Sequence, residues 1–248
     1  SINIINSLKK LEYRGYDSAG IATLTSNEIN EKKCSGRVEE LEKILFKTPS
    51  NGNIGIGHVR WATHGVPNVA NAHPHSSEKV SVVHNGIIEN SDEIKKDLEK
   101  KGLQFKSQTD TEVITLLLTE ALKENKPLDS VFETLGKLKG SFALGIIFKD
   151  FSDIIIGARR GSPLAVGFSK DENYLGSDSY ALKSMTNKIS YLDDGEICVL
   201  SKDNVSFYDS HNNKINKKVH TLSEDENMVE KGEYKNFMSK EIFEQPLT

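Results

Sequence analysis

The strongest constraint on the fold is a pair of apolar runs separated by a short polar turn. The runs are 141–148 (SFALGIIF) and 154–158 (IIIGA), and Lys149 and Asp150 lie in the turn between them. Apolar runs of this length, rich in β-branched residues and bounded by turn residues, predict buried strands. Further short strands are expected at hairpin-like spacing, over 164–168, 174–176, 189–192, 196–200 and 205–208.

The first half of the chain mixes helical and strand patterns. Apolar residues at helical spacing predict helices over 2–12, 37–46, about 91–101, about 110–122 and 128–138. Strands are expected over 21–24, 54–60 and 80–84, with Asn85-Gly86 as a tight turn. The long polar stretch 61–79 is predicted to be a functional loop. This mixture favours an α+β fold in layers over a doubly wound parallel sheet.

Composition excludes several classes of protein. The formal net charge of -4 and the sequence pI of about 6.0 give no reason to expect nucleic acid or an anionic membrane as a partner. The longest apolar stretch, 142–148, is too short to span a bilayer. Cys34 and Cys198 make no disulfide framework, so we expect a soluble cytoplasmic protein.

The first candidate for chemistry is the segment 57–65 (GHVRWATHG), in which a strand ends at Arg60 and a loop begins at Trp61. An arginine at a strand end can hold a carboxylate by two parallel hydrogen bonds, and Thr63 and the backbone after it can add donors. A short segment like this is, taken alone, more often a surface arginine beside a packed tryptophan.

Two further segments each allow a structural and a functional interpretation. In 83–90 (VHNGIIEN), Asn85-Gly86 is first of all a turn. Its side-chain amide and the backbone N–H of Gly86 can also converge as an oxyanion hole. In 109–113 (TDTEV), Asp110 can cap a helix, or its carboxylate can pair with a substrate ammonium at the mouth of a pocket.

The histidines and the segment 11–20 are less informative. His73 and His75 in 71–75 (NAHPH) suggest a metal pair, but no carboxylate or cysteine stands at a matching spacing. Histidines that order the loop are favoured, and no metal is expected. A metal-dependent hydrolase remains a minor alternative, using His58, His64, His73, His75 and His84. No chemical role follows from spacing for 11–20 (LEYRGYDSAG), which contains Arg14.

Taken together and in this order, the five segments resemble the class II, or N-terminal-nucleophile (Ntn), glutamine amidotransferases. Segments 61–65 (WATHG), 71–75 (NAHPH) and 84–90 (HNGIIEN) are similar to the glutaminase half of the isomerising glutamine–fructose-6-phosphate aminotransferases. Segment 238–246 (MSKEIFEQP) resembles the junction with the sugar-isomerase half of that subfamily. The resemblance implies an Ntn-hydrolase-like αββα four-layer sandwich of two mainly antiparallel sheets, and no cofactor.

The resemblance also implies which residues bind L-glutamine. Arg60 would hold the α-carboxylate, and Thr63 and His64 would help through the same loop. Asp110 would pair with the α-ammonium, with the carbonyl oxygen of Gly86 beside it.

A second group of residues would serve the reaction. Asn85 and the N–H of Gly86 would form the oxyanion hole. Trp61 would gate the passage between the glutamine pocket and an ammonia channel. Arg14 and His73 are expected to give support near the site.

The nucleophile of this family is an N-terminal cysteine on a strand ahead of the first helix, and the sequence begins with Ser1 and a helical pattern instead. Cys34 lies outside every matched segment, and Cys198 lies in an apolar strand, so neither is expected to replace that cysteine. We therefore expect 1–225 to be a glutaminase domain that lacks its first strand and is inactive as given. We expect 226–248 to be a linker and the start of an absent sugar-isomerase domain.

The resemblance implies a full-length cytoplasmic homodimer that hydrolyses L-glutamine to glutamate and ammonia. The ammonia would pass to fructose 6-phosphate in the sugar-isomerase domain and give glucosamine 6-phosphate. A non-catalytic domain that senses glutamine is the alternative, because the same residues would bind the ligand.

Overall fold

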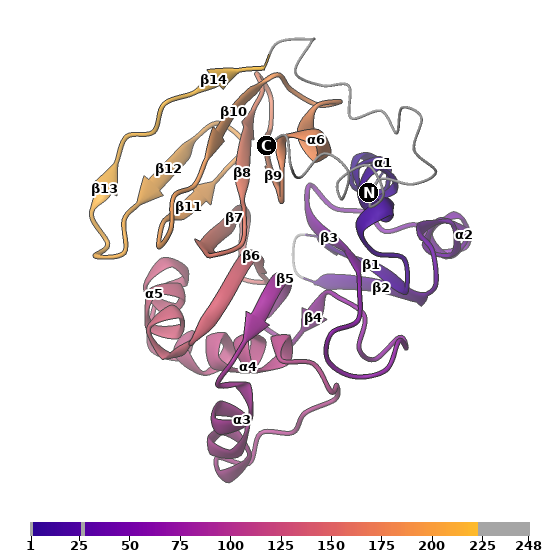
Figure 1. The fold of residues 1–248 in the computed structure, drawn as a ribbon, viewed down its shortest axis with the longest axis vertical. Coiled ribbons are helices and arrows are strands. Elements are labelled where there is room, and N and C mark those ends of the chain that lie inside the picture. The colour runs from indigo at the N-terminus through magenta and orange to yellow at the C-terminus, as the bar shows by residue number, and fades with distance from the viewer. Residues whose placement is uncertain (1, 26–27, 223–248) are drawn as a thin grey trace, which may run out of the picture.

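The computed structural model describes residues 2–25 and 28–222, in which helices lie on both sides of stacked sheets (Figure 1). A three-stranded antiparallel sheet has the order β2-β1-β3. Its strands are β1 (Ser18–Leu24), β2 (Ile29–Ser35) and β3 (Ile54–Arg60). Helices α1 (Ile2–Leu11) and α2 (Val38–Lys47) pack against it, and Leu8, Ile21 and Leu41 are buried between them.

A seven-stranded antiparallel sheet has the order β13-β12-β11-β7-β6-β5-β4. Its strands are β4 (His75–Ser76), β5 (Val80–Ile88), β6 (Gly140–Phe148), β7 (Phe151–Arg160), β11 (Ile197–Leu200), β12 (Val205–Tyr208) and β13 (Lys214–Ile215). Three helices cover one face of it, α3 (Ser91–Lys100), α4 (Thr111–Ala121) and α5 (Pro127–Lys137). The largest apolar core lies between these helices and the sheet, with Ile114, Leu118 and Phe142 almost fully buried.

A smaller four-stranded sheet has the order β14-β10-β8-β9. Its strands are β8 (Ala165–Phe168), β9 (Asn173–Gly176), β10 (Lys188–Tyr191) and β14 (His220–Thr221). The short helix α6 (Ser179–Leu182) follows β9 and contacts α1. A 3-10 helix, Glu12–Arg14, joins α1 to the turn before β1.

The three- and seven-stranded sheets face each other. Ala22, Leu24 and Ile56 from one sheet pack against Ile147 from the other. Helices, sheet, sheet and helices therefore follow one another in four layers, as the αββα arrangement requires. The predicted α+β fold is confirmed.

The prediction of a tight turn at Asn85-Gly86 was wrong. Strand β5 continues through both residues to Ile88, and they pair with Ala143 and Phe142 of β6. Gly86 has a φ of 132°, and a Cβ on it would lie 2.1 Å from the carbonyl oxygen of Ser141. Gly86 keeps its positive φ inside a long strand pair, because pairing along the whole of β6 outweighs the tendency of Asn-Gly to turn.

Strand β2 was not predicted from the sequence. Its apolar alternation is interrupted by the charged run 31–33 (EKK), and its side chains are mostly half-buried, as befits an edge strand. The strand places Cys34 within a sheet, opposite Ala19 of β1. Residues 226–248 lie outside the described part of the chain, so the domain boundary near 225 stays a prediction. Within the described ranges, no helix is long and apolar enough to cross a membrane.

Candidate functional site

A cavity of about 1230 Å³ lies between β3 and β5 and extends along α1 toward β9 and α6. Most of the residues singled out from the sequence line it: His58, Arg60, Trp61, Thr63, His64, His73, His84, Asn85, Gly86 and Asp110. They come from segments far apart in the chain, and the packing of the two sheets brings them together. The cavity is therefore the candidate site.

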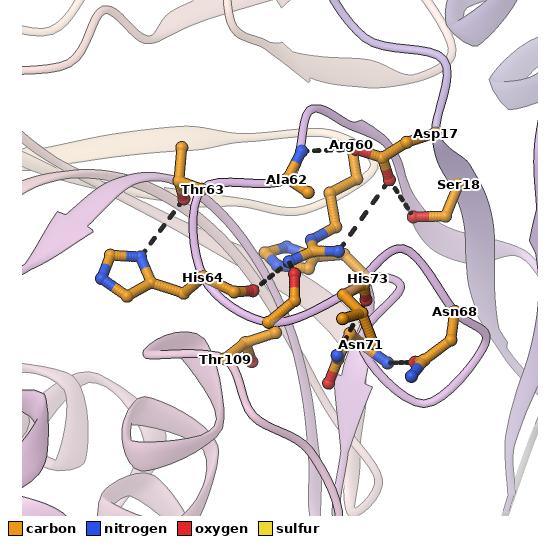
Figure 2. A network of polar contacts seen from close by, with 12 residues as sticks. Asp17, Ser18, Arg60, Ala62, Thr63, His64, Asn68, Asn71, His73 and Thr109 are labelled. Carbon is orange, nitrogen blue, oxygen red and sulfur yellow. Dashed lines mark hydrogen bonds and ion pairs between the residues drawn. The ribbon is translucent and has the colours of Figure 1, made fainter.

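Arg60 ends β3, and its side chain is almost fully buried. Its Nη2 atom donates to the carbonyl oxygens of His64 and, at 3.5 Å, of Gly65, so the loop after β3 wraps around the guanidinium (Figure 2). Its Nη1 atom has no hydrogen-bond partner among the described residues. Desolvation lowers the pKa of Arg60, and the carboxylates of Asp17 and Asp110 oppose this. A buried N–H that lacks an acceptor is costly, and a ligand carboxylate would satisfy it well.

Asp17 anchors the same loop from the turn before β1. Its Oδ2 atom accepts a hydrogen bond from the backbone N–H of Ala62, and its Oδ1 atom accepts one from the Ser18 hydroxyl at 2.7 Å. The Oδ1 atom also lies 3.9 Å from Nη1 of Arg60 (Figure 2). Asp17 belongs to segment 11–20, to which spacing had assigned no role. Only the pairing of β1 with β3, which places Ser18 opposite Arg60, brings the two segments together.

The loop after β3 also carries the remaining predicted residues of its segment. Trp61 has 55% of its surface exposed and contacts the ring of Tyr16 edge-on, with 6.1 Å between the centroids. Thr63 and His64 are exposed, and Oγ1 of Thr63 lies 3.3 Å from Nδ1 of His64. These three side chains stand at the solvent side of the cavity, where a ligand would enter.

Asn85, Gly86 and Asp110 line the cavity from the β5 side. Asn85 is exposed, and its Oδ1 atom lies 2.8 Å from Nε2 of His58. Asp110 precedes α4 and is buried, yet its carboxylate does not cap the helix. Its Oδ2 atom accepts from the backbone N–H of Ile88 at 2.8 Å. Asp110 therefore presents a negative charge beside β5, on the side of the cavity facing Arg60.

Four buried or half-buried histidines form the wall behind these residues. The rings of His58 and His73 are stacked with centroids 4.4 Å apart, and His73 meets His75 edge-on at 4.9 Å. The Thr111 hydroxyl lies 2.9 Å from Nδ1 of His84 and 3.3 Å from Nε2 of His73. Desolvation is the main cause that lowers the pKa of each histidine, to about 4 for His58. All four are neutral near pH 7.

Among the described residues, no group of three or more His, Cys, Asp or Glu side chains is arranged so that it could hold a metal ion. The histidines instead bond to hydroxyls, an amide and the backbone. Both cysteines are buried free thiols. Burial raises the pKa of Cys34, and it raises the pKa of Cys198 to about 12, so neither is a reactive thiolate.

One residue of the site was not predicted from the sequence, and one prediction concerns a side chain that the structure does not describe. Asp17 was missed because its role depends on contacts across the sheet. The prediction for Arg14 concerns its side chain, which lies outside the described part of the structure, although its backbone lies in the 3-10 helix.

Three comparisons place the chain among known proteins. Residues 58–184 match the family model described as a glutamine amidotransferase domain. The chain is 47% identical, over 98% of its length, to a glutamine–fructose-6-phosphate aminotransferase [isomerizing] of Bradyrhizobium diazoefficiens, and 49% identical, also over 98%, to that of Mesorhizobium japonicum. It spans only 40% of the length of each of these relatives.

The fold is also similar to solved structures. The glutamine phosphoribosylpyrophosphate amidotransferase of B. subtilis superposes with a TM-score of 0.73 at 25% identity, covering 86% of this chain and 47% of that one. A glutamine aminotransferase class-II domain protein from Silicibacter pomeroyi superposes with a TM-score of 0.54 at 14% identity, covering 78% of this chain and 91% of that one, which shows the fold alone. Family match, sequence identity and fold agree, and the chain belongs to the glutamine amidotransferase domain family.

Proposed function

We propose that the cavity between β3 and β5 binds L-glutamine and that this chain is the glutaminase part of an amidotransferase. One arrangement carries the proposal: the opposite charges of Arg60 and Asp110 line a single cavity together with Asn85 and Gly86. The free guanidinium N–H of Arg60 would take the α-carboxylate, and Asp110 would take the α-ammonium beside the carbonyl oxygen of Gly86. Thr63 and His64 would close over the ligand from the loop.

The side-chain amide of glutamine would then reach Asn85 and Gly86. In the proposed reaction, a cysteine thiolate attacks the amide carbon, and the carbonyl oxygen becomes an oxyanion. The Asn85 amide and the N–H of Gly86 donate to it, and losing one such donor typically costs about 3 kcal/mol of transition-state stabilisation. The C–N bond breaks, and ammonia leaves with the proton that the general base took from the cysteine thiol. Water then hydrolyses the γ-glutamyl thioester to glutamate and restores the thiol.

The nucleophile is proposed to lie outside Ser1–Thr248. Cys34 and Cys198, the two cysteines of the sequence, are buried thiols with raised pKa values, and neither is among the residues that line the cavity. An N-terminal cysteine on a strand ahead of α1 would supply both the thiol and, through its α-amine, the base, as the resemblance to the Ntn amidotransferases implies. Arg14 and His73 are proposed as support near it. The chain by itself is then expected to bind glutamine without hydrolysing it.

The proposed ligand contacts are tested by calorimetry on the 248-residue chain. Asp110→Asn keeps an oxygen for the N–H of Ile88 but removes the charge, so glutamine should bind at least about tenfold more weakly. Asp150→Asn, in the exposed turn between β6 and β7, is the matched control and should bind as the wild type. 4-Carbamoylbutanoate, which is glutamine without its ammonium, should bind Asp110→Asn and wild type alike. Equal glutamine affinity in Asp110→Asn and wild type would overturn the assignment.

The activity of the whole protein is proposed from the relatives. The longer proteins that the chain matches bear the name glutamine–fructose-6-phosphate aminotransferase. We propose that a sugar-isomerase domain of the same protein receives the ammonia and takes fructose 6-phosphate to glucosamine 6-phosphate. We propose that 226–248 is the linker and the start of that domain, and that the full-length protein is a homodimer. The two free thiols suit a cytoplasmic location.

Trp61 is proposed to gate the passage of ammonia. In the full-length enzyme, Trp61→Ala should leave glutamate formation within about twofold of wild type, because the side chain is largely exposed. Glucosamine 6-phosphate formed per glutamate should fall. An unchanged ratio of the two products would remove Trp61 from this role.

A glutamine sensor is the second candidate function, and the inert state of both cysteines favours it for this chain alone. Adding a Met-Cys-Gly-led strand ahead of Ser1 separates the two candidates. A chain that then releases glutamate and ammonia supports the enzyme. One that still binds glutamine and releases neither product supports the sensor.

A further inference from the structure

An asparagine that serves an oxyanion must point its nitrogen, and not its oxygen, at the developing charge. The side-chain amide has two ends of similar size, and rotation about its last bond exchanges them. Among the described residues, the exposed side chain of Asn85 has one hydrogen-bond partner, the ring of His58, whose Nε2 atom lies 2.8 Å from Oδ1 of Asn85. The orientation of the Asn85 amide therefore depends on which nitrogen of the His58 ring carries the hydrogen.

His58 is held rigidly in place. It stands two residues before Arg60 on β3, so both side chains project from the same face of the strand. Its ring stacks on His73 with an interplanar angle of 26°. His73 is fixed in turn, since its Nδ1 atom accepts from the backbone N–H of His84 at 3.4 Å and its Nε2 atom meets the Thr111 hydroxyl. The stack leaves the Nε2 edge of His58 facing Asn85.

The charge state of the His58 ring follows from its surroundings. Desolvation lowers its pKa to about 4, and the positive charge of Arg60 acts in the same direction, as does His84 once it is protonated. The hydrogen bond to Asn85 and the charge of Asp17 oppose the shift without cancelling it. Near neutral pH the ring is uncharged and carries a single N–H.

The position of that hydrogen is decided by its possible acceptors. The Nδ1 atom of His58 is enclosed and has no hydrogen-bond partner among the described residues, so a hydrogen there would be a buried donor without an acceptor. It would also set the lone pair of Nε2 against the oxygen of Asn85 at 2.8 Å. A hydrogen on Nε2 removes both penalties and makes one good hydrogen bond.

We propose that His58 is a positioning residue for the glutaminase reaction, whose Nε2–H holds Oδ1 of Asn85 and so turns the amide nitrogen of Asn85 toward the reacting oxygen of the substrate. This assignment rests on the proposed role of Asn85 in the oxyanion hole. His58 itself touches neither substrate nor nucleophile in this scheme. It acts by excluding the orientation in which the oxygen of Asn85 would repel the oxyanion.

The first test needs no activity. Nitrogen-15 NMR of histidine-labelled chain, at about pH 7, distinguishes a protonated ring nitrogen from an unprotonated one. We expect His58 to be protonated at Nε2 and unprotonated at Nδ1. We also expect a through-bond or exchange cross-peak between the His58 ring and the side-chain amide of Asn85, and this cross-peak should be lost in Asn85→Ala. A hydrogen on Nδ1 would overturn the proposal, whether or not the chain binds glutamine.

The second test uses the chain extended by the cysteine-led strand. His58→Gln retains a donor toward Asn85, and His58→Phe retains the bulk of the ring without a donor. We expect His58→Phe to lower kcat by about 10- to 100-fold with KM within about twofold, because a lost orientation is felt only in the transition state. His58→Gln should recover most of kcat. Equal losses in both variants would overturn the proposal.

A double-mutant cycle separates positioning from general damage to the fold. In an Asn85→Ala background, the amide has already gone, so adding His58→Phe should lower kcat by less than about twofold further. A full additional loss would show that His58 acts by another route. If wild-type chain fails to bind glutamine at all, the proposed function fails, while the NMR result still decides how His58 and Asn85 are paired.

Discussion

Acid should destabilise this domain through its buried histidines, and His58 allows the effect to be calculated. The unfolded chain takes up a proton on this histidine near its ordinary pKa of 6.5, whereas the folded chain does so only near pH 4. Between these values the unfolded state binds more protons, so the free energy of unfolding falls as pH falls from about 6.5 to about 4. The stability from this group is fully present above that window.

The magnitude follows from the two pKa values. Moving the pKa from 6.5 to about 4 corresponds to about 3.4 kcal/mol, at about 1.36 kcal/mol per pH unit. About 3 kcal/mol of this would be lost on going from pH 7 to pH 4, since the folded state is half-protonated there. The figure is an upper limit, because one edge of the His58 ring faces the cavity and its water.

His58→Gln removes the titrating group and keeps a donor toward Asn85. Urea unfolding followed by circular dichroism, at steps from about pH 7 to pH 4, gives the stability curve of each chain. The loss of stability across this range should be up to about 3 kcal/mol smaller in His58→Gln than in wild type. His73, His75 and His84, whose pKa values are also lowered, still titrate in both chains.

Asn85→Ala is the matched control, since it removes the hydrogen bond between His58 and Asn85 but leaves His58 to titrate. That bond raises the pKa of His58, so the control should lose at least as much stability in acid as the wild type. If His58→Gln and wild type lose stability in parallel from pH 7 to pH 4, His58 is not a buried neutral group, and the reasoning about its single N–H is refuted as well.

Three further predictions concern stability and loop order. Gly86→Ala should destabilise the domain by about 2–4 kcal/mol, because φ is 132° and a Cβ would clash with the backbone of β6. Gly136→Ala in α5, where a Cβ would meet open space, should stabilise the domain by about 0.5–1 kcal/mol. Thermal melts of both variants check these values. Glu112→Ala should lower the free energy of unfolding, measured in urea, by about 2–4 kcal/mol, because the buried carboxylate accepts three hydrogen bonds from 106–107. The control Glu99→Ala, at an exposed position of α3, should change it by less than about 0.5 kcal/mol. Asp17→Asn should weaken glutamine binding about three- to tenfold in calorimetry by loosening the loop around the substrate, and affinity equal to wild type would deny it that role.

Much of the fold could be predicted from local patterns. The strands over 54–60 and 205–208 were predicted with the bounds that the structure has, because apolar residues between turn residues report strand burial directly. Strand β2 could not be predicted, since an edge strand with charged side chains needs no apolar alternation. The prediction of a turn at Asn85-Gly86 was wrong because the turn preference of two residues is local, whereas pairing of β5 with β6 extends over nine residues.

The sequence by itself determined the family and the chemical character of the site. Arg60, Asn85, Gly86 and Asp110 stand in segments whose order and identity are specific to glutamine amidotransferases, and side-chain chemistry limits what such groups can bind. The resemblance of those segments to the family also predicted the four-layer αββα fold.

Only the tertiary structure decided how these groups act on one another. Asp17 meets the loop of Arg60 because β1 pairs with β3, and His58 meets Asn85 because one sheet packs on the other. Burial then keeps the histidines uncharged and favours one of the two nitrogens of the His58 ring as the carrier of its hydrogen. Desolvation and hydrogen-bond geometry depend on neighbours in space, and no spacing along the chain encodes them.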